Sequence, residues 1–544
     1  MRKTGLRILS AILLYALLFA GCANNNPQST NKPDDSAVVL PTPTPAADII
    51  PNADGKLYMY VPRNAVLANP LTVNTEVMQS MYSLIFESLI ELDESAMVVP
   101  CLASSWTRSE TDQNTWVFLL RENCKWQKDR GQFTGKDVVD TIEAIRELGE
   151  DNYYYECIED IVRYSYSETE PYKLSITFSH PGLSAVAKLT FPIIKTSALD
   201  AQIPIGTGAY EVVRSNDTST VLQANQNWWK RAPYISQITY LVRDSEEIAL
   251  DSYSAGQLNF ITTSALYSGT YRESNHTNVV DFMTQDMEVM LFNHKKALLK
   301  DSRMRRALAY CVNRQEIISY VYMNKAHECD VPIAPDAYAY DGAYKLYDYN
   351  TEKALSLLTE LGYSDNDDDG KLELGVSTSE LTLRLLVNTV SQNMIRSDAA
   401  KKIQEQFAKV GITVEVIEAE FNRKDGGEYL RMLKEGDFDI ALCGFNMSMA
   451  YDLRAVLSSS GDRNYGRYSS AEMDSLVTAL YMSKDEAETR ANAGALMKGF
   501  TEELPFMVLY YRMNSLIYTS ELNGVTALRK PDILRNIENW YMYE

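Results

Sequence analysis

One segment of the chain has the residue spacing of a calcium-binding loop. Asp365, Asp367 and Asp369 stand at its first, third and fifth positions, and Gly370 stands at its sixth. Such loops also need a bidentate glutamate at position 12, where this chain has Val376. We therefore interpret the segment as a solvated acidic turn, keep a weak calcium site as the alternative, and predict no metal.

The residue types that most often carry catalysis are scattered. The histidines lack the spacing to one another or to a cysteine that a zinc site requires; they are His180, His276, His294 and His327. The chain contains neither a Gly-x-Ser-x-Gly nor a His-Glu-x-x-His sequence, so no such motif supports a common hydrolase mechanism. We predict that the protein is not an enzyme and uses no cofactor. Because enzymes can lack short motifs, an extracellular hydrolase stays as an alternative.

The seven cysteines comprise Cys22 near the start and six in the remaining chain. No two of the six are spaced C-x-x-C, so they indicate neither a zinc site nor a redox pair. An extracellular location would permit disulfides, but burial as free thiols is the simpler interpretation for most of them. The six are Cys101, Cys124, Cys157, Cys311, Cys329 and Cys443.

The start of the chain predicts secretion and lipid attachment. Three basic residues precede an apolar run of about 13 residues, which suits a signal peptide and is too short to span a bilayer. Residues 19–22 then read Phe-Ala-Gly-Cys, which resembles a lipobox with Phe19 at the usual leucine position. We expect a signal peptide over residues 1–21 and a lipidated Cys22 that anchors the protein on the outer side of the cell membrane. The alternative is an ordinary secretory signal with an incidental cysteine.

Composition separates a linker from the folded part of the chain. Residues 22–54 are rich in Asn, Pro, Ser and Thr and cannot bury enough apolar surface to fold, so we interpret them as a disordered tether. As a flexible coil the tether would reach about 30 Å. The remaining ~490 residues imply about three domains. The net charge of −21 argues against a nucleic-acid partner, which favours a basic surface.

Caps and hydrophobic periods predict alternating strands and helices. Residues 116–121 form an apolar, aromatic run typical of a strand, and Thr134 with Asp137 forms a capping box before a helix. Helical spacing from Ala400 to Val410 lies between two alternating segments, which predicts a β-α-β unit with parallel strands. We also expect a helix over residues 75–91.

The next helix after residue 301 carries a run of basic residues. We expect Asp301 or Ser302 to cap this helix. Because the helix is amphipathic, we interpret Arg303, Arg305 and Arg306 as a solvated face rather than a binding cluster.

Several segments resemble, in order along the chain, the bacterial extracellular solute-binding proteins of family 5, which serve peptide and nickel ABC importers. The first is a proline, a Leu-Ala pair, two tryptophans that flank a strand, and an Asp-Val-Val helix. Three further blocks follow it. The segments are 100–145, Pro204-Ile-Gly-Thr-Gly-Ala-Tyr210, Asn227-Trp228-Trp229, and Leu291-Phe-Asn293 with residues 301–310.

The resemblance implies an α/β fold of two lobes, the periplasmic-binding-protein-like fold of type II, in the large cluster with an extra inserted domain. It implies a discontinuous lobe I made of residues 55–90, 201–283 and 510–544. The inserted domain would cover residues 91–200 and lobe II residues 284–509. A hinge would let the two lobes close over a ligand.

The resemblance also implies ligand contacts from four places. They are the loop after the first strand, a tyrosine segment of the inserted domain, the strand that ends near residue 446, and the last long strand. The residues are Asn64, Ala65, Tyr153, Tyr154, Tyr155, Gly444, Phe445, Asn446, Tyr510 and Tyr511.

One position departs from the pattern of the peptide-binding members. In those proteins a Gly-Trp pair is followed by an aspartate that pairs with the peptide's α-amino group. Here Phe445 replaces the tryptophan, Ser448 stands at the aspartate's place, and Asp452 lies nearby but out of register. A buried ammonium group needs a paired charge. We therefore expect no strong selection for a free N-terminus, with an ion pair to Asp452 as the rival hypothesis.

Together these features predict a monomeric, lipid-anchored substrate-binding protein of an ABC importer. It would capture a small ligand, which we expect to be a peptide, and deliver it to the permease subunits. ATP hydrolysis would belong to the partner subunits. The alternatives are an oligosaccharide or a chelated metal bound by the same fold, or the hydrolase named above.

Overall fold

A computed structural model describes most of the chain after the predicted linker. Its described residues are 54–63, 67, 69–73, 75–198, 203–345, 347–422, 424–526, 528–530 and 532–543. The signal peptide, Cys22 and nearly all of the linker lie outside them, as do Asn64 and Ala65. From residue 51 onward the chain is one compact unit. None of the described helices combines the length and apolar character that crossing a membrane requires.

The first sheet joins the start of the folded chain to a segment that follows about 150 residues later. Its strand order is β1-β10-β9-β8, and β1 pairs with β10 in parallel. Helices α1 and α5 accompany this sheet. The elements are β1 (Gly55–Pro62), β8 (Tyr210–Asn216), β9 (Ser219–Ala224), β10 (Ile235–Arg243), α1 (Glu76–Ser83) and α5 (Glu246–Ser254).

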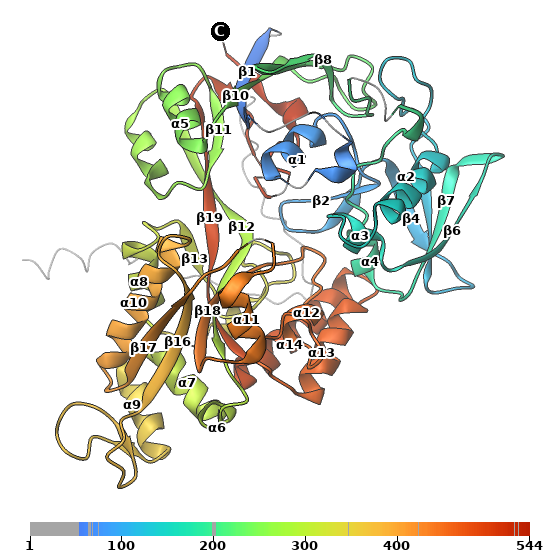
Figure 1. Ribbon diagram of the computed structural model, residues 1–544. Helices are drawn as coiled ribbons and strands as arrows, with labels where there is room; N and C mark the ends of the chain where they lie inside the picture. The colour runs from blue at the N-terminus through green and yellow to red at the C-terminus, as the bar shows by residue number, and fades with distance from the viewer. Residues whose placement is uncertain are drawn as a thin grey trace, which may run out of the picture. The chain divides into compact units, whose positions relative to one another are not determined.

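The chain between these two segments forms a second, antiparallel sheet of four strands. The strand order is β4-β5-β7-β6, and α2 packs against it (Figure 1). The elements are β2 (Ile90–Leu92), β3 (Val98–Pro100), β4 (Ala103–Arg108), β5 (Thr115–Leu120), α2 (Gly135–Leu148), α3 (Tyr155–Ile158), β6 (Ile161–Ser167), β7 (Glu170–Phe178) and α4 (Leu183–Ala187).

The third sheet has seven strands, in the order β11-β19-β12-β18-β16-β17, with β13 paired to β19. Its two long strands, β12 (Thr277–Phe292) and β19 (Phe506–Thr519), run from the part of the molecule near α5 to the part near β16–β18 (Figure 1). Both strands therefore cross the predicted boundaries between lobes I and II. The others are β11 (Phe260–Thr263), β13 (Ala326–Glu328), β16 (Thr382–Asn388), β17 (Thr413–Ala419) and β18 (Ile440–Asn446).

Helices cover both faces of this sheet, and each face has its own apolar core. Because side chains alternate along a strand, Met290 and Phe292 of β12 face one core while Val289 and Leu291 face the other. The first core contains residues of α7 (Ser302–Cys311), α8 (Arg314–Tyr320), α9 (Thr351–Glu360) and α10 (Met394–Ala408). The second contains residues of α11 (Gly427–Glu435), α12 (Arg454–Leu457), α13 (Ala471–Tyr481) and α14 (Glu486–Glu503).

The predicted β-α-β unit is confirmed. β16 and β17 pair in parallel, and α10 connects them. The Thr134 capping box is also confirmed, since Asp137 accepts a hydrogen bond from the Thr134 backbone at the start of α2. Asp301 caps α7 as expected.

Two expectations about helices were wrong in part: the length of the helix predicted over residues 75–91, and the solvent exposure of the basic run on α7. Helix α1 ends at Ser83, because the carbonyl groups of Leu84 and Ile85 instead accept hydrogen bonds from Tyr210 and Gly208. These bonds require two backbones to approach closely, and a Cβ at Gly208 would lie 2.5 Å from the Leu84 oxygen.

The basic run on α7 is not wholly solvated. Arg305 is 2% exposed and donates hydrogen bonds to the carbonyl oxygens of Leu299, Lys300 and Leu504. Its role is to close the end of another helix, since Leu504 is the C-cap residue of α14. The six cysteines after Cys22 are free thiols, as expected, and five of them are buried.

Candidate ligand-binding site

A cavity of about 270 Å³ lies beside the two long paired strands, β12 and β19. It is lined by the end of β1, by α1, by the end of β11 and by β12 and β19. Ligand sites of small-molecule-binding proteins commonly occupy roughly 300–1,000 Å³. The cavity is slightly smaller than this range, which suits a very small ligand or one end of a longer one.

An irregularity in strand pairing gives this cavity its polar wall. The register of β12 against β19 shifts between Met283 and Met287, so residues 284–286 bulge opposite Arg512. The Thr284 hydroxyl donates a hydrogen bond of 2.9 Å to the Arg512 carbonyl and fixes the bulge. Bulges commonly occur next to binding sites because they redirect side chains. Asp286, Arg512 and Asn514 all line the cavity as a result.

The other charged groups of the cavity are already partnered. Lys530 forms an ion pair of 2.5 Å with Glu76. Glu246 accepts hydrogen bonds from the Thr263 hydroxyl and from the backbone of Ser264.

The predicted ligand residues of β18 and β19 lie near one another across β12. Gly444 and Tyr510 are both opposite Glu288, while Phe445 and Tyr511 are both opposite Met287. The side chains of these aromatic residues point into the cores: Tyr510 and Tyr511 are each 1% exposed, and Phe445 stacks on Tyr465. Asn446 is exposed, and its amide donates to Asp286 at 2.9 Å, which connects the predicted group to the cavity.

A buried ion pair supports this group and was missed by the sequence analysis. Arg396 of α10 donates two hydrogen bonds of 2.9 Å to the Glu288 carboxylate, and a third to Asn388. Glu288 is 4% exposed. The two residues are 108 positions apart, so no local spacing could have indicated the pair.

The predicted tyrosines of the inserted domain lie at the start of α3. Tyr153 is 55% exposed and packs edge-on against Tyr154, with ring centroids 4.9 Å apart. Tyr154 and Tyr155 contact the core of the first two sheets. The Asn152 amide donates to the Leu71 carbonyl at 2.8 Å and fixes this segment near the first strand.

Asp452 is occupied by partners within the protein. Arg454 donates to both of its carboxylate oxygens, at 2.8 and 2.6 Å, and the Lys188 ammonium group lies 3.7 Å away. Burial raises the pKa of Asp452 but the hydrogen bonds from Arg454 outweigh it, so the net shift is downward. Ser448 is exposed, and its hydroxyl accepts a hydrogen bond from Ala450.

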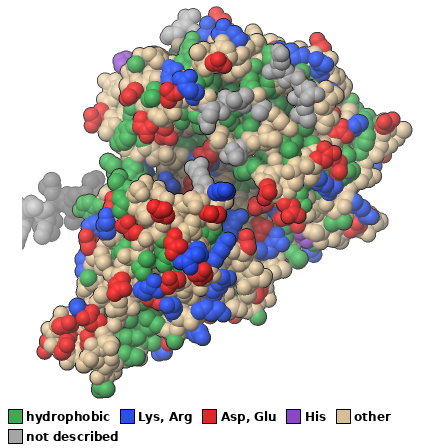
Figure 2. All heavy atoms as spheres, in the orientation of Figure 1, with side chains coloured by type: hydrophobic (Ala, Val, Ile, Leu, Met, Phe, Trp, Pro, Cys, Tyr) green, Lys and Arg blue, Asp and Glu red, His purple; other side chains and the backbone are tan. Residues whose placement is uncertain are grey.

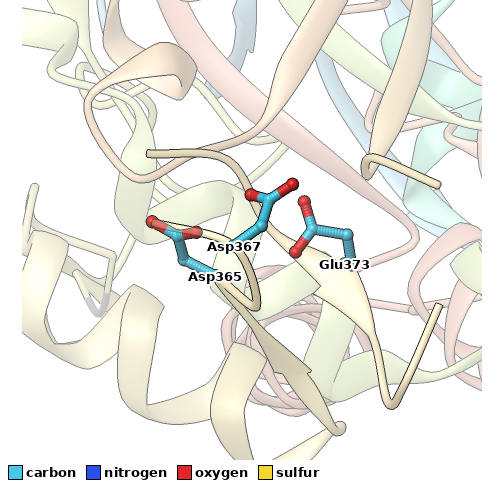
Figure 3. Close-up of side chains that lie close together, drawn as sticks. All are labelled: Asp365, Asp367 and Glu373. Carbon is cyan, nitrogen blue, oxygen red and sulfur yellow. The ribbon is translucent and has the colours of Figure 1, made fainter. Parts of the chain in front are cut away.

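The acidic turn of the sequence analysis is a compact cluster away from this cavity. One carboxylate oxygen from each of Asp365, Asp367 and Glu373 lies within 4.8 Å of the others. Figure 3 shows the three side chains close together. Glu373 stands at position 9 of the loop and accepts a hydrogen bond from the Asn366 backbone. Asp365 accepts two backbone hydrogen bonds from the same turn, so hydrogen bonding alone accounts for its closed form.

The family model of the bacterial extracellular solute-binding proteins, family 5 (middle region), matches residues 97–466. That match covers more than half of the chain. The protein belongs to this family. Its fold is therefore the two-lobed α/β fold of family 5, in agreement with the resemblance found in the sequence.

Two curated relatives show the range of this family. The oligopeptide-binding protein AppA of Bacillus subtilis is 24% identical, and the alignment covers 99% of each chain. The nickel-binding periplasmic protein of Escherichia coli is 22% identical, over 81% of this chain and 86% of the relative.

Solved structures of family 5 proteins have the same fold. AppA of Bacillus subtilis in complex with a nonapeptide superimposes with a TM-score of 0.65, at 22% identity, and covers 91% of this chain and 100% of AppA.

Proposed function

We propose that this family 5 protein is the substrate-binding component of an ABC importer and that its ligand is a peptide. The observation that carries the proposal is the end-to-end similarity to an oligopeptide-binding protein, with 99% of both chains aligned. A cavity with polar walls beside the two long paired strands, β12 and β19, supports it. The protein would bind without catalysis and deliver its ligand to permease subunits as a monomer.

The proposed site comprises the cavity together with the residues implied by the family resemblance. Asn446 belongs to both groups through its hydrogen bond to Asp286. The buried aromatic residues Phe445, Tyr510 and Tyr511 would shape the wall of the site rather than contact the ligand through their polar atoms.

The test is to incubate the purified protein with a random peptide library, separate it by size exclusion, and identify bound and cleaved peptides by mass spectrometry. Captured, uncleaved peptides are the expected result. Cleavage would instead favour a hydrolase. Capture of no peptide, with a metal chelate or an oligosaccharide co-purifying, would favour the other ligands of the alternative hypothesis.

We further propose that Cys22 carries the lipid that holds the protein on the outer side of the cell membrane. The basis is the lipobox-like sequence before it. Expression of Cys22→Ala in the native host with a radiolabelled fatty acid tests this. We expect the variant to lose the label and to accumulate uncleaved or in the medium. Normal processing with retained label would refute the anchor.

A further inference from the structure

Arg512 is the charged group of the cavity that has no counterpart. Within the described part of the chain, no hydrogen bond or ion pair involves its guanidinium group. The flanking residues of β19 are fully buried, whereas residues 512–514 are half-buried at the cavity. A guanidinium group has five donors in a planar fork, and leaving these donors unpaired beside an apolar core is unfavourable.

The lining around Arg512 offers unpaired polar groups as well as the carboxylates of Glu76, Glu246 and Asp286. Asn514 lies two residues further along β19, on the same face of the strand, and its side-chain amide is also without a partner among the described residues. Ser80 and Tyr240 also line the cavity; their hydroxyl oxygens are buried and have no hydrogen-bond partner among the described residues. Ser80 is 7% exposed and Tyr240 1% exposed.

Unpaired donors around one guanidinium group are the complement of an anion with several acceptor atoms. Arg512 and Asn514 are half-buried, line the cavity and have no side-chain partner within the described part of the protein, so these two side chains indicate a ligand that supplies acceptors at this place. A carboxylate matches the guanidinium fork with two parallel hydrogen bonds.

The carboxylates of the cavity restrict the charge of that anion. Glu76 is neutralised by Lys530, and Glu246 is held by two donors of the protein, but Asp286 has only the Asn446 amide. A doubly charged anion such as phosphate would be repelled by Asp286 more strongly than a singly charged one. The cavity therefore favours a monocarboxylate.

We propose that Arg512, assisted by Asn514, binds a carboxylate of the ligand in this cavity. For a peptide ligand, this group would be the C-terminal carboxylate. The inference rests on the proposed function for the nature of the ligand, but the binding of a carboxylate at Arg512 does not depend on it.

The test compares two random tripeptide libraries, one with free C-terminal carboxylates and one with C-terminal amides, in competition for the same protein. Mass spectrometry counts the captured peptides of each kind. We expect the free acids to be captured at least about tenfold more than the amides, because amidation removes the charge-assisted hydrogen bonds. Arg512→Gln should abolish this preference.

Two variants serve as comparisons. Arg431→Gln makes the same chemical change on the exposed face of α11, where Arg431 pairs with Glu428, and should keep the full preference. Arg512→Lys keeps the charge but not the planar fork, and should retain a reduced preference. Circular dichroism verifies that each variant is folded. If Arg512→Gln does not fold, the wild-type and Arg512→Lys results decide.

The outcomes separate the two proposals. Equal capture of acids and amides by the wild type, or an acid preference that survives in folded Arg512→Gln, overturns the role of Arg512 and leaves the receptor function intact. Capture of neither library overturns the peptide ligand. In that case N-acetyl-L-alanine and its amide, at millimolar concentration, are compared by thermal shift: stabilisation by the acid alone, lost in Arg512→Gln, supports the carboxylate site, and no difference refutes it.

Discussion

At the scale of single residues, the carboxylate of the rival amine site, Asp452, is already paired. Asp452 accepts two hydrogen bonds from Arg454 and lies near Lys188, so an incoming ammonium group would have to displace them. Ser448 offers a hydroxyl group and no charge. The structure thus adds a physical reason to expect weak discrimination at a peptide's N-terminus.

We predict that N-acetylation of a captured peptide weakens its binding by less than tenfold, or about 1.4 kcal/mol. Calorimetry with the matched free and acetylated peptides measures the difference. A larger loss would show that a carboxylate does receive the amine. Asp452→Asn and Asp286→Asn then identify which one, because only the responsible variant would lose the preference.

Glu87 is a buried acid whose titration should affect stability. Its carboxylate accepts hydrogen bonds from the indole groups of Trp228 and Trp229, at 3.1 and 2.8 Å. Burial is the main cause that raises its pKa from 4.5 to about 7. Between these two pH values the folded protein binds more protons than the unfolded chain, so this contribution to stability is full below pH 4.5 and declines as the pH rises through 7.

We predict that Glu87→Gln removes a pH-dependent loss of roughly 3 kcal/mol in unfolding free energy between pH 4.5 and pH 8, at about 1.4 kcal/mol per pKa unit. Urea unfolding of wild type and variant across this range gives the difference. The exposed Glu110→Gln is the matched control and should leave the pH profile unchanged. Parallel profiles for wild type and Glu87→Gln would contradict the prediction.

At this scale the sequence could suggest site residues from their position in a family pattern, such as Gly444 and Asn446, and their roles stay predictions. It could not identify Arg512, Asp286 or the pair of Glu288 and Arg396, because these side chains meet only after distant strands pair. One signal was available: Arg512 is the one charged residue of its strand and stands directly after Tyr510 and Tyr511.

At the scale of elements, α4 of the inserted domain is tied to the end of α13. The Lys188 ammonium group donates to Asp160 at 2.8 Å and to Glu159 at 2.9 Å, and the Tyr481 hydroxyl donates to the same Asp160 carboxylate. The Ser184 hydroxyl donates to the Tyr481 carbonyl at 2.6 Å. The side chains of Lys188 and Asp160 are only 9% and 12% exposed.

We predict that Lys188→Met lowers the unfolding free energy by about 3–5 kcal/mol, because it leaves the Asp160 carboxylate buried without its cation. Urea unfolding measures the change. Lys173→Met removes an exposed ion pair with Glu170 on β7 and should change stability by no more than about 0.5 kcal/mol. Equal effects of the two substitutions would mean that the buried network contributes nothing special.

Local signals explain why some elements were predictable. The caps at Thr134 and Asp301 and the alternating strands around α10 were predicted correctly because each depends on neighbouring residues. The end of α1 was not predicted correctly, because the hydrogen bonds that Gly208 and Tyr210 donate to the backbone after the helix override helical propensity. The bulge in β12 likewise depends on its pairing with β19 and leaves no local trace.

At the scale of the whole molecule, the face drawn in Figure 2 carries charges of both signs. Acidic and basic side chains are interspersed over the face drawn in Figure 2, although the net charge of the chain is −21. Attraction of ligands by a single strongly charged surface is therefore not needed to explain binding. Recognition is expected to depend on the few unpaired groups inside the cavity.

We expect the two long strands to be the elements through which the lobes move. β12 and β19 are paired on both sides of an interruption at residues 284–286 of β12. Arg512 of β19 lies opposite this interruption. A bulge weakens the hydrogen-bonded ladder locally, so bending is easiest there. A ligand bound to Arg512 would thus sit at the hinge itself and favour the state that surrounds it.

We predict that a saturating captured peptide reduces the radius of gyration in small-angle scattering. The protein without its leader and tether is the appropriate sample, because a flexible tether would dominate the scattering. Arg512→Gln with the same peptide at the same concentration is the comparison, and its radius should fall only in proportion to the fraction that calorimetry shows to be bound. An unchanged radius for the wild type at proven saturation would mean that this protein binds without lobe closure, since closure that accompanies binding must bring the mass of the two lobes together.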